Sequence, residues 1–181
     1  MKDFNETMEY LGDTKILTLG EIIRYNDRPK IKNESVAEHS FYVANNVIRI
    51  CSLYNIPMEV KHEALEMAIA HDIPEVFTGD IGYITKRDNP ELAVALERTE
   101  LKQLKLNMPE HYVAFRNYVE GLKHRDLAAV IVKLADIISV LQYSNSEIEL
   151  GNSSKAMQDI NIDAQERVQS YLEILQSELE W

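Results

Sequence analysis

Residues 127–143 of this 181-residue chain read LAAVIVKLADIISVLQY. Apolar side chains occupy nearly every position of this stretch, and a helix that is apolar on all sides is buried on all sides. We therefore expect a central helix from about Arg125 to Tyr143. Such a helix needs other helices around it, which favours an all-α fold.

The remaining chain has helical periodicity almost throughout. Ser35 and Glu38 have the spacing of a capping box, so they predict the start of a helix that ends at Asn55 and Pro57. The next helix is expected from about Met58 to Val76, with Pro74 kinking its end. Further helices are expected from Pro90 to Leu106, from Pro109 to Leu122 and from about Lys155 to Leu179, with loops at Ile81 to Asp88 and Ser144 to Ser154. We predict a single all-α domain over residues 1–181, a compact bundle of six or more helices with its core at roughly 15–145 and an amphipathic helix at roughly 155–179.

The charge balance limits the partners of this domain. Nineteen Lys and Arg against 30 Asp and Glu give a net charge of −11, which argues against long nucleic acids and anionic membranes as partners. Cys51 is the single cysteine, so a reducing, cytoplasmic setting is expected. No run of about 18 apolar residues is present and the acidic first ten residues do not resemble a signal peptide, so neither a membrane span nor secretion is expected.

Four polar side chains interrupt the apolar faces of the predicted helices: His39, His71, Asp72 and Asp136. A carboxylate taken out of water costs several kcal/mol unless it is paired or binds a cation. Asp136 has one candidate partner in Lys133, one turn earlier, so a local ion pair beside hydrogen-bonded core histidines explains each residue taken singly. Three separate helices nevertheless bring imidazole or carboxylate to the core. Together these groups predict a divalent-metal site.

His71 and Asp72 are adjacent, and adjacent helical residues point about 100° apart. They cannot grip one small ion from a straight helix. Pro74 distorts this turn, so we expect the two side chains to converge at the kinked end of the helix.

The pattern His39, His71-Asp72, Asp136 resembles the HD-domain metal-dependent phosphohydrolases. The likeness extends to the 5′-deoxynucleotidase branch, which typically shows an Arg-aromatic pair, E-x-V-x-E-H-S, H-D-x-x-E-x-x-T-G-D and K-x-A-D. Here those motifs are Arg24-Tyr25, residues 34–40, residues 71–80 and residues 133–136. The resemblance covers roughly residues 15–145, and the family more often has Trp at the position of Tyr25.

The resemblance implies a role for each matched residue. It implies that His39, His71, Asp72 and Asp136 hold one divalent metal ion, which is Co, Mn, Zn, Fe or Mg. It implies that Glu75 is the acid/base or water-orienting residue and that Asp80 is a second carboxylate near the sugar or the attacking water. Arg24 and Lys86 would face the phosphate and Tyr25 the base or sugar.

Plainer interpretations of these residues stay open. Glu75 has the position of an exposed helix-end carboxylate, and Asp80 that of a turn residue bonded to its own backbone. Arg24 is also compatible with a surface salt bridge and Tyr25 with a place in the core. The acidic pair Glu147 and Glu149 is interpreted as a solvated face or a dimer contact.

Three functions compete. The first is a cytoplasmic, homodimeric 5′-deoxynucleotidase, a hydrolase that releases phosphate from deoxynucleoside 5′-monophosphates. The second is a deoxynucleoside triphosphate triphosphohydrolase, for example one directed at dATP, that uses the same metal centre. The third is a non-catalytic regulatory domain that keeps the metal for structure. Retention of Glu75 and Asp80 beside the four predicted ligands favours an enzyme.

Overall fold

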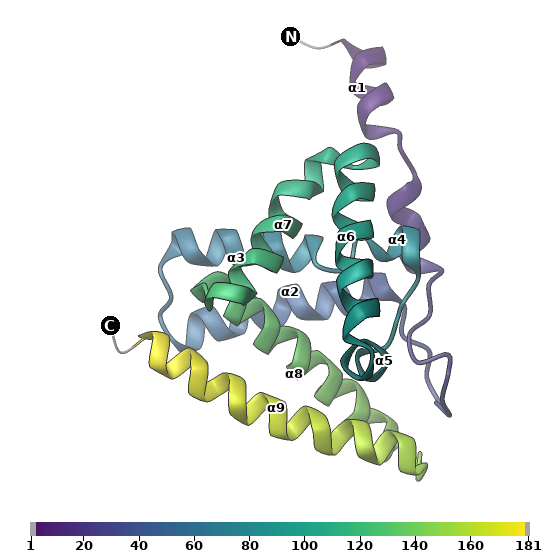
Figure 1. Ribbon diagram of the computed structural model, residues 1–181, viewed down its shortest axis with the longest axis vertical. Helices are drawn as coiled ribbons and strands as arrows, with labels where there is room; N and C mark the ends of the chain where they lie inside the picture. The colour runs from purple at the N-terminus through teal and green to yellow at the C-terminus, as the bar shows by residue number, and fades with distance from the viewer. Residues whose placement is uncertain (1–2, 180–181) are drawn as a thin grey trace.

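The computed structural model describes residues 3–179, and these residues fold as a helical bundle (Figure 1). Within that range the β-type pairing is a single bridge between Ile23 and Ser35. The all-α prediction is confirmed. The elements are α1 (Phe4–Leu11), the 3₁₀ helix η1 (Lys15–Gly20), α2 (Val36–Leu53), α3 (Met58–Ala70), α4 (Glu75–Thr78), α5 (Tyr83–Asp88), α6 (Pro90–Asn107), α7 (Pro109–His124), α8 (Leu127–Glu149) and α9 (Lys155–Leu179).

Helix α8 is the centre of the bundle. It packs against α9, α2, α3 and α7, and α9 runs along it for most of its length (Figure 1). Ile131, Leu134 and Ile137 are fully buried on it. The helix is long and apolar enough to cross a membrane by composition, but most of that apolar window is buried inside the bundle, as in the core helix of a globular protein.

Helix α8 continues beyond the predicted end at Tyr143. It runs to Glu149, so the expected loop from Ser144 to Ser154 is short. The polar residues that suggested a loop are bonded inside the fold: Asn161 of α9 donates to Ser144 Oγ at 3.0 Å. Glu147 has no exposed surface, so its interpretation as a solvated residue is wrong, whereas Glu149 is exposed.

Three further boundaries differ from the prediction. Helix α3 ends at Ala70, four residues before Pro74, and α4 starts at Glu75 as a separate short helix. Helix α5 occupies part of the predicted loop Ile81 to Asp88. Helix α1 buries none of its residues and projects from the bundle (Figure 1).

Glu147 fastens the segment 21–34, which connects η1 to α2, to the carboxyl end of α8. Its two carboxylate oxygens accept hydrogen bonds from the backbone amides of Ile31 and Lys32, each at 2.7 Å. Asn152 donates to the same carboxylate at 2.8 Å and to the carbonyl of Pro29 at 3.1 Å. A charged acceptor with three donors is a strong local tether.

We expect Glu147→Ala to lower the free energy of unfolding by about 1–3 kcal/mol, because it leaves buried donors without an acceptor. Glu149→Ala, two residues away on the exposed side, should change it by less than about 0.5 kcal/mol. Urea denaturation followed by circular dichroism measures both. Equal effects of the two substitutions would contradict the tether.

The same tether should make stability depend on pH. Burial raises the pKa of Glu147, but hydrogen bonds from Asn152 and the amides of Ile31 and Lys32 outweigh it, so the pKa lies below its usual value. A carboxyl whose pKa is lowered by folding stabilises the fold above its unfolded pKa, and this contribution is lost as pH falls through the folded pKa. Between about pH 5 and pH 3 the wild-type protein should therefore lose more stability than Glu147→Gln.

Candidate metal centre and active-site cavity

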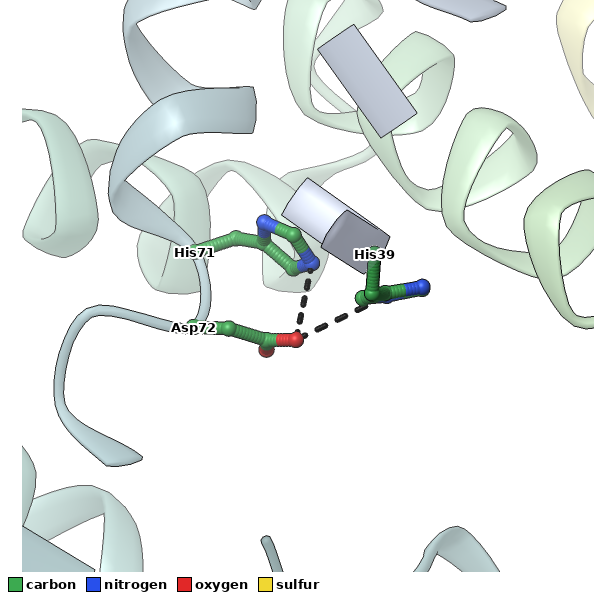
Figure 2. A group of neighbouring side chains, drawn as sticks. All are labelled: His39, His71 and Asp72. Atoms are coloured by element: carbon green, nitrogen blue, oxygen red, sulfur yellow. Dashed lines mark ion pairs between the residues drawn. The ribbon is translucent and has the colours of Figure 1, made fainter. Parts of the chain in front are cut away.

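Three helices bring the four predicted ligands together. His39 comes from the first turn of α2, His71 and Asp72 follow the end of α3, and Asp136 lies in the middle of α8. Figure 2 shows the His39 and His71 rings and the Asp72 carboxylate pointing toward one another. Asp72 Oδ2 lies 3.2 Å from His71 Nε2 and 3.5 Å from His39 Nε2, and Asp136 Oδ1 lies 3.2 Å from His39 Nε2.

The turn after Ala70 explains how neighbouring residues converge. The chain leaves the α3 helix at His71, and Pro74 starts the next one. The amides of Ile73 and Glu75 bond to the carbonyls of Ala70 and Asp72 in tight turns. This irregular turn brings both side chains to one point, as the sequence predicted.

The outer nitrogen of each histidine is held by the protein. His71 Nδ1 lies 2.7 Å from the carbonyl oxygen of Ala68, which can only accept, so Nδ1 carries the proton. His39 Nδ1 pairs with Ser139 Oγ at 3.2 Å. A neutral imidazole protonated at Nδ1 presents the lone pair of Nε2, which is the form that binds a metal.

The inner atoms of the site are buried without hydrogen-bond partners. Among residues 3–179, five buried side-chain atoms have none, and three of them are His39 Nε2, His71 Nε2 and Glu75 Oε2. Ligands bound at about 2.1 Å with angles of 90–110° lie about 3.0–3.4 Å from one another. The nitrogen-to-oxygen distances of 3.2–3.5 Å fit one divalent ion held by His39, His71 and Asp72, whose ligand atoms all lie within 4.8 Å of one another, with Asp136 beside them against His39.

Local electrostatics favours the deprotonated forms of His39 and Asp136, whereas the charge of Asp72 outweighs burial and raises the pKa of His71. Burial and the charge of Arg24 lower the pKa of His39 to about 4. Burial raises the pKa of Asp136, but Lys133 at 2.8 Å and His39 outweigh it, so the pKa lies well below its usual value. The predicted Lys133–Asp136 pair is thus present, beside the imidazoles and without replacing them.

Glu75 faces the same cavity with different properties. Its side chain is buried, and burial together with the charges of Asp72 and Asp80 raises its pKa well above the ordinary value. The interpretation of Glu75 as an exposed helix-end carboxylate is therefore wrong. Asp80 follows Gly79, whose positive φ of 73° turns the chain back toward the site, and burial raises its pKa as well. A raised pKa brings a carboxyl closer to the range that suits a general acid.

The predicted substrate residues line one cavity of about 830 Å³ with His71, Asp72, Glu75, Asp80 and Asp136. Arg24 is held by Glu34, whose carboxylate accepts from Nη1 at 2.9 Å, and its guanidinium lies over the Tyr25 ring at 5.1 Å. Arg24 is therefore in a buried ion pair at the cavity and not a surface salt bridge. Lys86 reaches the cavity from α5.

Sequence reasoning missed several residues of the site. Ser139 orients His39, and it was visible as a polar residue one turn after Asp136 in an apolar helix. Arg167 of α9 lines the cavity and lies 3.8 Å above the ring of Tyr83. No local signal connected the last helix with the site, because this contact joins residues far apart in the chain.

Known proteins resemble the chain over most of its length. A 5′-deoxynucleotidase of Vibrio vulnificus (strain YJ016) is 29% identical over 140 residues, which are 74% of this chain and 72% of that protein. A dATP triphosphohydrolase of an Acinetobacter phage (SH-Ab 15497) is also 29% identical, over 76% of this chain and 68% of that protein.

Solved structures share the fold. The HD-domain phosphohydrolase of Listeria innocua superposes with a TM-score of 0.73 at 21% identity, over 93% of this chain and 82% of that one. The cyanophage S-2L HD phosphohydrolase, bound to dA and one catalytic Zn²⁺ ion, gives 0.72 at 18% identity, over 93% and 94%. The HD-domain helical fold predicted from the sequence is confirmed.

The family model of the YfbR-like 5′-deoxynucleotidases matches residues 14–177. That range extends beyond the span of about 15–145 over which the motifs suggested the resemblance. It includes all four presumptive ligands, Glu75, the cavity wall and nearly all of α9. The chain therefore belongs to the YfbR-like 5′-deoxynucleotidase family.

Proposed function

We propose that this chain is a metal-dependent 5′-deoxynucleotidase, which converts deoxynucleoside 5′-monophosphates into deoxynucleosides and phosphate. The observation that carries the proposal is the pair of buried Nε2 atoms of His39 and His71 without hydrogen-bond partners, at a cavity that His71 and the buried Glu75 line. Family membership and the 5′-deoxynucleotidase of Vibrio vulnificus support it.

His39, His71, Asp72 and Asp136 would hold one divalent ion. When bound, such an ion polarises the phosphoryl group and lowers the pKa of a bound water. Imidazole with carboxylate suits Zn, Co, Fe or Mn, and carboxylate extends the range to Mg. The zinc of the cyanophage neighbour supports Zn among these candidates.

The chain's own residues supply the proton and the orientation. Water attacks phosphorus, the bond from phosphorus to the 5′ oxygen breaks, and that oxygen takes up a proton. Burial and the charges of Asp72 and Asp80 raise the pKa of Glu75, so this carboxyl would take up a proton from the attacking water and donate one to the leaving oxygen. Asp80 lies on the same wall, where it would accept from the sugar hydroxyl or orient the water.

Arg24 and Lys86 would bind the phosphate oxygens, and Tyr25 would contact the base or sugar. The Arg24 guanidinium has five N–H donors, more than its pair with Glu34 uses. That pair fixes its plane and leaves donors for the substrate. Lys86 lines the same cavity as Glu75 and Asp80, which supports a role for its positive charge in binding the phosphate.

The charges of the wall favour a monophosphate over a triphosphate. Of the described residues that line the cavity, nine are Asp or Glu and five are Lys or Arg. Three of the five cations are already paired at 2.8–2.9 Å: Arg24 with Glu34, Arg28 with Asp27 and Lys133 with Asp136. A triphosphate would need further cations, so the activity of the phage relative is the second candidate here. A purely structural metal site would not need the unpartnered Glu75, which speaks against a non-catalytic domain.

We also propose that the 181 residues act as one domain, as a homodimer and in the cytoplasm. Exposed apolar side chains on α2, with Phe41 69% and Ile48 44% exposed, support a self-association surface. A buried, unpaired Cys51 is consistent with a reducing compartment. Sedimentation velocity measures the oligomeric state directly.

The proposed reaction predicts phosphate release from deoxynucleoside monophosphates in the presence of Mn, Co, Zn or Mg. The assay measures phosphate, pyrophosphate and triphosphate from a panel of deoxy- and ribonucleoside mono- and triphosphates. We expect phosphate from the deoxynucleoside monophosphates and loss of activity with a chelator. Triphosphate release from dATP as the main reaction would favour the second candidate.

Glu75→Gln should lower kcat by about 10²–10⁴-fold, because the amide cannot donate or accept the proton. Thermal stability should hardly change, since Glu75 Oε2 has no hydrogen bond to lose. Glu97→Gln is the matched control: it removes a carboxylate from the same cavity wall, on α6. Full activity of Glu75→Gln would refute its assignment as the proton donor.

Asp72→Asn should reduce the metal content well below one ion per chain, because an amide is a weaker ligand than a carboxylate. Asp88→Asn, at the end of α5 and paired with Arg87, should leave the metal content unchanged. Mass spectrometry of the metal after dialysis measures both. A wild-type chain that binds no divalent ion would contradict the metal centre.

A further inference from the structure

One face of α8 carries both ends of the site. Asp136, Ser139, Tyr143 and Glu147 follow at spacings of three, four and four residues, which places them on one side of a helix. The first two contact His39, and the last two contact the segment 21–34. That segment carries Arg24 and Tyr25 into the cavity.

Tyr25 has an unusual backbone. Its φ is +57°, in the left-handed region that residues with a side chain rarely adopt. Such a conformation costs of order 1 kcal/mol or more and persists where the surroundings enforce it. The amide of Arg24 donates to the carbonyl of Glu34, and the amide of Val36 donates to the carbonyl of Ile22. These bonds flank the isolated bridge between Ile23 and Ser35, so Tyr25 follows directly after a paired stretch of backbone.

Tyr143 stacks on the Tyr25 ring. The two rings stack with their centroids 4.6 Å apart and their planes within 4°. The Tyr143 hydroxyl donates to the carbonyl of Lys32 at 2.7 Å, which fixes the far side of the same segment. Tyr143 is buried and, within the described chain, is not among the side chains that line the cavity. Its influence on a ligand is therefore indirect, and the stack with Tyr25 is its contact with a side chain that lines the cavity.

We propose that Tyr143 is a positioning residue for substrate binding, which sets the plane of the Tyr25 ring through their stack. The inference rests on the proposed function, because it assumes that Tyr25 contacts the nucleoside part of the substrate.

Helix α8 also sets the distance between the metal end and the Tyr25 end of the site. A helix rises about 1.5 Å per residue, so Asp136 and Tyr143 are separated by about 10 Å along a rigid axis. The metal end and the Tyr25 end therefore keep a fixed separation, while the covering residues of α5 and α6 belong to other elements. A fixed separation selects a ligand whose anionic group and nucleoside lie at matching positions.

The test compares two phosphomonoesters. One is a deoxynucleoside monophosphate; the other is glycerol phosphate, which has neither base nor deoxyribose. Tyr143→Leu removes the stack, and we expect KM for the nucleotide to rise about fivefold with kcat within about twofold. kcat/KM for glycerol phosphate should stay unchanged. Tyr143→Phe keeps the stack and should restore the wild-type KM.

A double-mutant cycle tests the route of the effect. If Tyr143 acts through Tyr25, Tyr25→Leu raises KM at least as much, and Tyr25→Leu/Tyr143→Leu raises it no further. Leu175→Ala, which removes a buried side chain of another cluster, controls for lost stability, which thermal melting records. It should lower the melting temperature without changing KM.

The outcomes separate the inference from the proposed function. An active wild-type enzyme in which Tyr143→Leu leaves KM unchanged, impairs both phosphomonoesters equally, or adds fully to Tyr25→Leu overturns the positioning role alone. Should Tyr143→Leu not fold, Tyr143→Phe with a raised KM also overturns it, because the stack is then intact. A wild-type chain that hydrolyses no deoxynucleotide overturns the proposed function and the inference with it.

Discussion

The carboxylate of Asp136 in the middle of the most apolar helix is the constraint on which the rest of the structure depends. A buried charge is tolerated only with partners, and α8 offers one of its own in Lys133 at 2.8 Å. That pair does not satisfy Asp136 Oδ1, which faces His39 Nε2 at 3.2 Å. His39 in turn faces Asp72, and Asp72 faces His71. These contacts run from α8 to α2 and on to the end of α3. The packing of the three helices and the assembly of the site therefore depend on each other.

Helix α8 meets both requirements because most of its length is buried and because it extends beyond its apolar part. Its apolar turns hold Asp136 at the core, where α2, α3, α7 and α9 fix its position. Its polar last turns, with Tyr143 and Glu147, hold the segment 21–34. Loops are the usual place for substrate contacts, but here the segment that carries the proposed substrate residues Arg24 and Tyr25 is tethered to the helix that carries the proposed ligand Asp136. The Asp136 side and the Tyr25 side of the cavity are therefore both held by the same helix.

The sequence predicted the parts of the structure that have local causes. The capping box at Ser35 is formed, with Glu38 donating its amide to Ser35 Oγ and accepting from the Ser35 amide. The apolar run of α8 was likewise visible in residue order, and so was a disturbance near Pro74, although the structure shows a break between α3 and α4 where a kink in one helix was expected. The role of Glu147 was not visible, because its carboxylate accepts hydrogen bonds from backbone amides more than a hundred residues away. The left-handed backbone conformation of Tyr25 could not be predicted, because no glycine stands at that position. The contact of Arg167 with Tyr83 could not be predicted either, because it joins two helices far apart in the sequence.

The acidic composition takes on a different meaning at the cavity. A net charge of −11 argues against long polyanions as partners, yet the same excess reaches the cavity wall, where nine carboxylates outnumber five cationic side chains. A phosphate dianion gains little by entering such a wall. The balance changes once a divalent cation is held by His39, His71, Asp72 and Asp136, since bound cations are often the largest local charges in a site. Without a bound cation, the carboxylates of the wall would repel a phosphate group. They would therefore make phosphate binding depend on the metal ion.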